Sequence, residues 1–277
     1  MKLHFPSQTL QLNQPCIMGI LNLTPDSFSD GGLFINKDNA LNHVAQMIND
    51  GAQIIDIGGE STRPGASDVS VDEECQRVIP LIKAIRETSD IPVSIDTSKT
   101  EVMQQAVAAG ASMINDVNAL RAEGAVELAA KLNVPVCIMH MQGLPRTMQH
   151  TPSYKNVVQE VKAFLKDRVD VCMKAGIKQK DIIIDPGFGF GKTLEHNLTL
   201  FKHLSDFEDL GFPLLVGVSR KSMIGQVLND APADERLYGS VALATLAAWM
   251  NTNILRVHDV KATADALKLC MAVKKTK

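Results

Sequence analysis

Hydrophobic positions along the chain fall into eight short runs, separated by longer stretches in which apolar residues recur with a helical period. The runs are rich in Val and Ile and apolar at nearly every position, which is typical of strands buried on both faces. We therefore predict eight strands, at Cys16–Asn22, Gln53–Gly59, Pro92–Asp96, Met113–Asp116, Pro135–His140, Ile182–Asp185, Pro213–Val218 and Ile254–His258.

Amphipathic stretches between these runs predict helices, for example at Asn39–Asp50, Val71–Thr88, Lys99–Ala109, Tyr154–Ala175 and Ser240–Asn251. Three glycines, Gly51, Gly110 and Gly176, follow such stretches, where a helix C-cap favours a positive φ. Strands that alternate with helices imply a parallel sheet with right-handed crossovers. Eight such units favour an α/β fold closed into a (β/α)8 TIM barrel, and an open doubly wound sheet is the alternative.

The chain shows no linker, repeat or low-complexity segment, so residues 1–277 are predicted to form a single domain. Residues 1–14 precede the first predicted strand and are expected to form a small cap over the bottom of the barrel. A barrel of about 250 residues is ordinarily one domain.

Charge and cysteine content narrow the possible functions. Lys and Arg total 28 and Asp and Glu total 31, a net charge of −3, which argues against a broad nucleic-acid footprint but leaves room for a local basic pocket. The five cysteines are widely spaced without a CxxC pair, so we expect no zinc site or disulfide framework and mostly buried thiols. No run approaches 18 apolar residues and no signal peptide begins the chain, so we expect a cytoplasmic protein without membrane contact.

Polar or ionisable residues close all eight predicted strands, at the ends where a barrel carries its active site. They are Asn22, Glu60, Asp96, Asn115 with Asp116, His140, Asp185, Ser219, and Arg256 with His258. Because strand ends are often exposed to solvent, polar residues are expected there, and this explains some of these positions. Solvent exposure does not explain Asp96 and Asp185, which follow Val-Ser-Ile and Ile-Ile-Ile and should lie deep in the mouth, where a carboxylate needs donors that a ligand can supply. For Asp56, in the middle of a strand, a purely structural role stays open.

Two loops after the first and second strands are long, glycine-rich and polar, which suits a mobile lid. They span residues 24–32 and 58–66, and they contain Phe28 and Arg63, side chains that gain little in a fully solvated loop. An ordinary flexible surface loop is the alternative for both.

The sixth loop, residues 185–193, resembles two nucleotide-binding motifs without matching either. Pro186 stands where a Walker A motif needs glycine, and Lys192 stands where a dinucleotide fingerprint needs it. We interpret its glycines as letting the backbone approach a flat ligand closely, with Phe190 available for stacking.

The seventh loop, Gly217 to Ser222, opens a helix, and helix N-termini attract anions. Ser219 would add a hydroxyl donor, although a plain serine cap is the alternative. Arg256 and His258 are two residues apart and project to the same side of the eighth strand. Together with Asn22 they could hold a diphosphate, with Mg²⁺ on the Asn22 oxygen.

Five segments then resemble, in the right order, the signatures of the dihydropteroate synthase family: residues 18–32, 58–66, 185–192, 219–225 and 256–260. The resemblance implies a transferase of folate biosynthesis and a sulfonamide target. It condenses (7,8-dihydropterin-6-yl)methyl diphosphate with 4-aminobenzoate to give 7,8-dihydropteroate and diphosphate. It also implies a Mg²⁺ cofactor and a homodimer.

The resemblance also assigns roles to residues at matching positions. Residues assigned to the pterin diphosphate are Thr62, Asp96, Asn115, Asp185, Lys221, Arg256 and His258. Residues assigned to the 4-aminobenzoate pocket are Phe28, Arg63, Pro64, Phe190, Ser219 and Lys221. Asn22 is assigned to the metal.

Two other functions stay open at this point. The pterin-binding domain of cobalamin-dependent methyltransferases, which binds a methylated folate, has a similar barrel, but this chain is too short to include a corrinoid domain. A non-catalytic pterin-binding paralogue would be signalled by loss of Asn22, Arg63 or His258, and all three are present.

Overall fold

Eight parallel strands form the central sheet of the computed structural model, which describes residues 1–6, 8–23, 33–61, 68–143, 148 and 151–276. These strands are β3 (Cys16–Asn22), β4 (Ile54–Gly58), β5 (Val93–Asp96), β6 (Met113–Asp116), β7 (Val136–Met139), β8 (Ile182–Asp185), β9 (Leu215–Val216) and β10 (Ile254–Val257). They pair in the order β8-β7-β6-β5-β4-β3-β10-β9. A parallel bridge between Ile184 and Leu214 joins the two ends of this order. The predicted TIM barrel is thus confirmed, and the open sheet is wrong.

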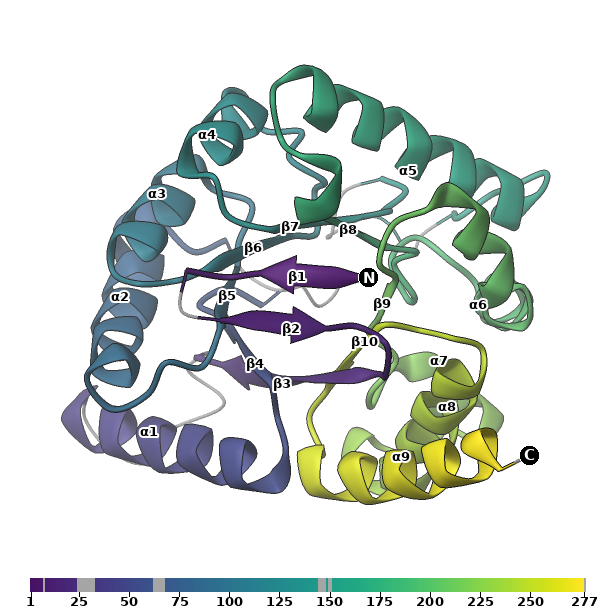
Figure 1. Ribbon diagram of the computed structural model, residues 1–277. Helices are drawn as coiled ribbons and strands as arrows, with labels where there is room; N and C mark the ends of the chain where they lie inside the picture. Colours follow the sequence, from purple (N-terminus) through teal and green to yellow (C-terminus); the bar gives the residue numbers. More distant parts are fainter. Residues whose placement is uncertain (7, 24–32, 62–67, 144–147, 149–150, 277) are drawn as a thin grey trace.

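Helices surround the barrel on its outside (Figure 1). They are α1 (Leu33–Asp50), α2 (Val71–Thr88), α3 (Thr100–Ala108), α4 (Ala125–Leu132), α5 (Val157–Lys174), α6 (Leu194–Lys202), α7 (Ser222–Val227), α8 (Leu237–Trp249) and α9 (Val260–Lys275). Gly51, Gly110 and Gly176 have φ of 109°, 115° and 103°, as expected beyond helix ends. The predicted start of α5 at Tyr154 was early, because the Asn156 side chain caps the helix by accepting from Gln159 N.

The seventh strand is shorter than predicted. It covers two residues in place of Pro213–Val218. At its start the Leu214 N–H donates to the Asn253 side chain at 2.8 Å, so a side chain takes the place of a ladder hydrogen bond. Pro213 has no N–H to offer, and its carbonyl accepts from Ile184 N at 3.0 Å.

Successive residues of each strand face opposite sides, and this alternation places the site. In β4, Ile55 and Ile57 belong to the main core between barrel and helices. Ile54 belongs to a second apolar cluster that fills the bottom of the barrel. Asp56 and Gly58 therefore share the inner face with Ile54, further toward the carboxyl end. The same two-residue alternation gives the barrel interior apolar residues near its bottom and polar residues near the carboxyl ends of the strands.

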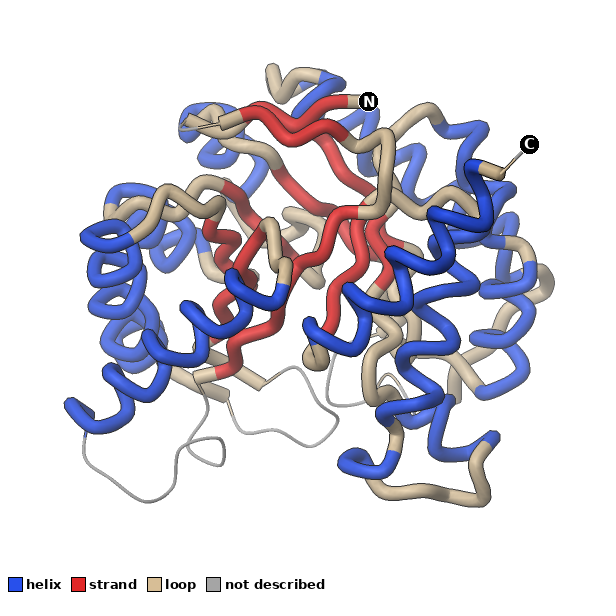
Figure 2. Tube along the Cα trace, turned by 60° about the horizontal axis from the view of Figure 1, so that its bottom comes forward, coloured by secondary structure: helices blue, strands red, loops and turns tan. Residues whose placement is uncertain are grey.

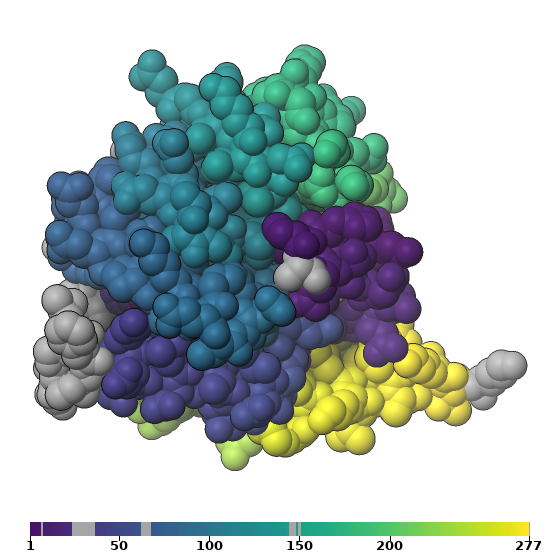
Figure 3. All heavy atoms as spheres, turned by 60° about the vertical axis from the view of Figure 1, so that its left-hand side comes forward, coloured from purple at the N-terminus to yellow at the C-terminus, as the bar shows by residue number. Residues whose placement is uncertain are grey.

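A short hairpin covers the bottom of the barrel. Strands β1 (Lys2–His4) and β2 (Thr9–Gln11) pair antiparallel. Their Leu3 and Leu10 side chains belong to the apolar cluster at the barrel bottom. Figure 2 shows the hairpin lying across one end of the strands, and Figure 3 shows it in purple at one edge of the molecule. The mouth with the polar strand ends is thus at the opposite end of the barrel.

All five cysteines are buried and free, as expected for small apolar residues. Within the described part of the chain, none of the helices has the length and apolar character needed to cross a membrane.

Candidate active site

Arg256 lies in the barrel mouth and binds carboxylates from two other strands, and an asparagine from a third strand joins the same group. Its Nε donates to Asp56 Oδ2 at 2.6 Å, and its Nη2 donates to Asp96 Oδ2 at 2.7 Å. Asn115 Nδ2 also donates to Asp56 Oδ2, at 3.2 Å. Because neighbouring parallel strands end at the same edge, residues far apart in sequence meet here. Of the predicted site residues, Asp96, Asn115 and Arg256 form one connected group with Asp56.

This group has more acceptors than donors. Asp56 Oδ1 and Asp96 Oδ1 are both buried without a hydrogen-bond partner among the described residues. Burial, opposed mainly by the Arg256 charge, raises the pKa of Asp96 to about 7. Burial acts to lower the pKa of Arg256, but the two carboxylates outweigh it and raise that pKa above its usual value. A ligand with two or more N–H groups would satisfy acceptors that the protein leaves open.

Asp185 lies at the end of β8 and is held by the loop that follows. Its Oδ1 accepts from Gly187 N at 2.7 Å. Burial raises its pKa, while the Gly187 N–H and the charges of Lys221, Lys192 and Arg256 lower it. Lys221 Nζ donates to Phe188 O and lies 4.2 Å from the centre of the Phe190 ring. Burial lowers the pKa of Lys221 to about 8, with Asp185 acting in the opposite direction.

Lys221 and Phe190 are therefore brought together beside Asp185, as predicted for residues of one site. Phe190 also packs against a small apolar cluster of Val117 and three methionines, which forms a nonpolar wall beside the polar group.

Two glycines of the sixth loop are required by close packing against the backbone of a neighbouring segment. A Cβ on Gly187 would lie 1.8 Å from His140 O, and a Cβ on Gly191 would lie 2.4 Å from Gln142 O. Both glycines also have positive φ. At these two positions the loop needs glycine to pack on the backbone after β7, a reason that the sequence did not reveal. The close approach of a flat ligand to this loop stays a prediction.

Ser219 and His258 meet at the ends of β9 and β10. Ser219 Oγ lies 3.0 Å from His258 Nδ1 and accepts from His258 N at 3.2 Å. These two contacts orient the His258 imidazole, and both of them use the hydroxyl group of Ser219. Arg220, the residue after Ser219, forms an ion pair with Asp259, with its Nε 3.0 Å from Asp259 Oδ2.

Gly58 leaves a gap between Asn22 and Asp96. A Cβ at this position would lie 3.4 Å from Asn22 Oδ1 and 3.6 Å from Asp96 Cβ. Glycine keeps this space beside the Asn22 oxygen free of a side chain. No group of three or more His, Cys, Asp or Glu side chains within the described ranges could hold a metal by itself.

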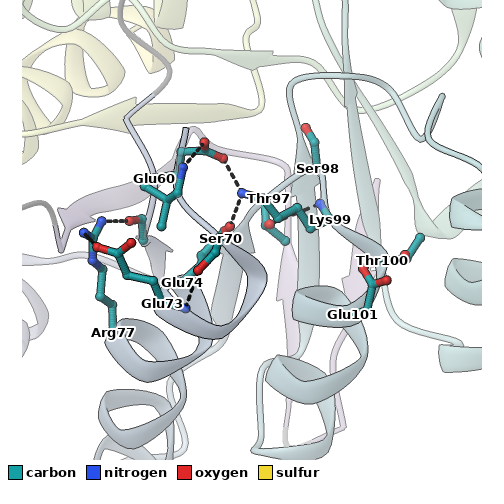
Figure 4. Close-up of polar contacts among 12 residues, drawn as sticks. Glu60, Ser70, Glu73, Glu74, Arg77, Thr97, Ser98, Lys99, Thr100 and Glu101 are labelled. Carbon is teal, nitrogen blue, oxygen red and sulfur yellow. Dashed lines mark hydrogen bonds and ion pairs between the residues drawn. The ribbon is translucent and has the colours of Figure 1, made fainter. Parts of the chain in front are cut away.

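A charged cluster holds the start of the second loop. Lys99 Nζ contacts Glu60 Oε2 at 2.5 Å and Glu74 Oε2 at 2.6 Å (Figure 4). Glu60 Oε1 accepts from Val69 N at 3.1 Å, which ties together the two ends of residues 60–69. Arg77 Nη1 donates to Gly59 O at 2.7 Å. The predicted site residues Phe28, Thr62, Arg63 and Pro64 lie outside the described residues.

Sequence reasoning gave too little weight to Asp56 and did not predict that Lys192 is buried. Asp56 had a usable signal, because it is two residues before Gly58 and so shares its face. Lys192 had none, because its burial follows from how the sixth loop folds back.

The barrel and its polar mouth define the class of protein. Residues 18–258 match the family of pterin binding enzymes, and the chain belongs to this family. The more particular likeness is to dihydropteroate synthases. The Haemophilus influenzae dihydropteroate synthase is 54% identical over 272 residues, 98% of each chain, and the Escherichia coli enzyme is 51% identical over 98% of this chain and 96% of its own.

Solved structures agree with this assignment. The Yersinia pestis dihydropteroate synthase in a sulfonamide drug complex superposes with a TM-score of 0.95 at 49% identity, with all of both chains covered. A Xanthomonas albilineans dihydropteroate synthase in complex with 7,8-dihydropteroate gives 0.92 at 44% identity, also over all of both chains.

Proposed function

We infer that the protein catalyses the dihydropteroate synthase reaction, joining (7,8-dihydropterin-6-yl)methyl diphosphate to 4-aminobenzoate with release of diphosphate. The observation that carries this inference is the likeness, along almost the whole chain, to dihydropteroate synthases at about half identity. The protein is accordingly a transferase of folate biosynthesis and a target for sulfonamides, which are bound by the Yersinia pestis relative.

The open acceptors of the mouth support a pterin site. A pterin presents a guanidine-like edge of N–H donors, which suits Asp185 and the unpartnered Asp96 Oδ1. Asn115 and Lys221 lie beside them and would read the remaining ring atoms. Each charge-assisted hydrogen bond would contribute about 1.5–3 kcal/mol.

Arg256 and His258 would hold the diphosphate at the end of β10, where Arg256 also faces the ring. The Arg256 charge and hydrogen bonds from His258 would favour departure of diphosphate, and the electron-rich dihydropterin stabilises the methylene cation that remains. Asp96 and Asp185 would stabilise this cation electrostatically. The amine of 4-aminobenzoate is neutral, so it attacks the methylene carbon without a strong general base. The C–N bond forms after the C–O bond to diphosphate has broken, and the ammonium produced then loses its proton to the released diphosphate or to water.

For 4-aminobenzoate we propose a pocket beside the pterin. Phe190 would contact its ring, and Ser219 and Lys221 would lie near its carboxylate, next to the start of α7. Phe28, Arg63 and Pro64 are assigned to this pocket, and Thr62 to the pterin diphosphate, by the family resemblance alone.

Mg²⁺ is the cofactor that we propose, held by Asn22 Oδ1 together with the diphosphate. The gap beside Gly58 gives this oxygen room for a ligand. Mg²⁺ commonly takes one or two protein oxygens and completes its shell with phosphate and water, so a single protein ligand fits. Bound there, it would neutralise charge on the leaving diphosphate. Turnover should fall on chelation and return with Mg²⁺, and full turnover in excess chelator would contradict this assignment.

A homodimer is also proposed, on the strength of an exposed apolar face. Tyr238, Leu246 and Trp249 are 84%, 52% and 51% exposed on α8, and Leu269 and Val273 are 72% and 63% exposed on the adjacent α9. Sedimentation should give twice the chain mass. The cytoplasmic location stays a prediction.

A test in cells is direct. Bacteria that lack their own dihydropteroate synthase should grow without folate end products when they express this chain. They should not grow when they express the Asp185→Asn variant at the same level. Failure of the unaltered chain to restore growth, although present in soluble form, would contradict the proposed function.

A further inference from the structure

Lys192 is buried in an unusual environment. It is 3% exposed, and it is the only lysine among the buried side chains of the described residues. Its Nζ donates to Gly187 O at 2.8 Å and to Phe190 O at 3.1 Å, and lies 2.9 Å from His140 Nδ1. Three acceptors match the three N–H groups of an ammonium. None of the ion pairs found between described residues involves it, so all three of these contacts are to neutral groups.

These contacts span the sixth loop from one end to the other. Gly187 is the residue whose N–H binds Asp185, and Phe190 is the residue whose ring lies under Lys221. Through His140, the same ammonium attaches both ends of the turn to the end of β7.

Two further side chains form hydrogen bonds with the backbone of this loop. Asn197 Oδ1 accepts from Gly189 N at 2.8 Å, and the Tyr154 hydroxyl donates to Gly191 O at 2.8 Å. The loop is thereby fixed at four of its residues before any substrate binds.

We propose that Lys192 is a positioning residue for the transfer reaction, which holds residues 187–190 against His140 so that Asp185 is correctly placed to bind the pterin. This inference rests on the proposed function, and specifically on Asp185 as the pterin anchor. Lys192 is too enclosed by loop carbonyls and His140 to be assigned a contact with either substrate.

The electrostatic effects on this group act in both directions. Burial and the nearby Lys221 charge lower the pKa of Lys192, while Asp185 opposes this change. In return, the Lys192 charge lowers the pKa of Asp185 and so favours the ionised carboxylate against the effect of burial. Burial, followed by the Lys192 charge, lowers the pKa of His140 to about 2, which keeps the imidazole neutral. A neutral ring nitrogen can accept from the ammonium.

The test is a double-mutant cycle between Lys192 and Asp185, with (7,8-dihydropterin-6-yl)methyl diphosphate as the calorimetric probe. Lys192→Met should weaken binding of this compound about tenfold in the unaltered background. It should weaken binding less than twofold when Asp185→Asn is already present, because residues that act through one another are not additive. Lys202→Met removes an exposed lysine of α6 and should leave the affinity unchanged.

Two precautions make the result decisive. Thermal unfolding of each variant establishes that it is folded at the assay temperature, and Lys192→Gln, which keeps two N–H donors, replaces Lys192→Met if that variant does not fold. Equal weakening in both backgrounds, or no weakening in either, would overturn the proposal. An unaltered protein that binds no pterin would overturn the proposed function as well, so the two failures are distinguishable.

Discussion

Replacing Asp96 by asparagine should make the ligand-free protein more stable at alkaline pH while removing most of its activity. The carboxylate is largely buried, its Oδ1 has no partner among the described residues, and its other oxygen binds Arg256 at 2.7 Å. The asparagine amide would keep an oxygen for Arg256 but would carry no charge. On the proposed function, Asp96 would therefore stabilise a bound pterin at a cost to the stability of the ligand-free protein.

The magnitude follows from the pKa of Asp96, which burial raises from 3.8 to about 7. Below about pH 4 the group is protonated in both the folded and the unfolded protein, and ionisation costs nothing. As the pH rises toward 7, the unfolded chain releases this proton before the folded protein does, so the free energy of unfolding falls. At about 1.4 kcal/mol for each pH unit, and with the folded group half ionised at pH 7, the difference between pH 5 and pH 7 is about 2 kcal/mol, and it approaches about 3 kcal/mol by pH 8.

Urea unfolding of both proteins from pH 5 to pH 8, without substrate, measures this difference. The stability of Asp96→Asn relative to the unaltered protein should increase by about 3 kcal/mol over this range. The asparagine NH₂ adds a buried donor whose cost of about 1–3 kcal/mol does not depend on pH, so the slope is the decisive quantity. A difference that stays constant with pH would refute the argument that Asp96 ionises against burial.

Three other substitutions test separate parts of the site. Asp185→Asn should keep the fold and lose most turnover, measured as dihydropteroate formed, and near-normal activity would remove the pterin-anchor assignment. Changes at Phe28 or Pro64 should raise the inhibition constant of a sulfonamide, and an unchanged constant would count against the proposed 4-aminobenzoate pocket. Lys99→Met should lower the free energy of unfolding by about 3 kcal/mol, because the fully buried Glu74 would lose its cation. Adding Glu74→Gln should recover part of this loss, and equal stability of Lys99→Met and the unaltered protein would contradict the buried-pair argument.

The fold was predictable because each strand is signalled locally. Continuous apolar runs between helical stretches identified all eight strands, and the glycines after three helices marked positive φ. Strand ends were less predictable where a hydrogen bond to a side chain replaces a backbone hydrogen bond between neighbouring strands. At β9, Asn253 from a neighbouring segment satisfies Leu214, and sequence alone does not reveal this partner.

The placement of the candidate site residues was predictable to the extent that it depended on the two-residue period of the strands. Asp96, Asn115, Asp185 and Arg256 are all found on the inner face of the barrel mouth. Period alone could not show that Arg256 binds Asp56, since 200 residues separate them.

Burial of polar side chains in loops was not predictable. Lys192 is part of a motif that looks like a solvated phosphate loop, yet its amine lies beneath that loop. Only the chain path, which brings residues 187–191 onto the backbone after β7, makes this position buried.

The central claim is tested most directly by diphosphate release from (7,8-dihydropterin-6-yl)methyl diphosphate with Mg²⁺, measured with and without 4-aminobenzoate. Release that depends on 4-aminobenzoate, with one dihydropteroate formed for each diphosphate, is the predicted result. Tight binding of the pterin compound without release under either condition would contradict the account and favour a protein that binds pterin without catalysing transfer.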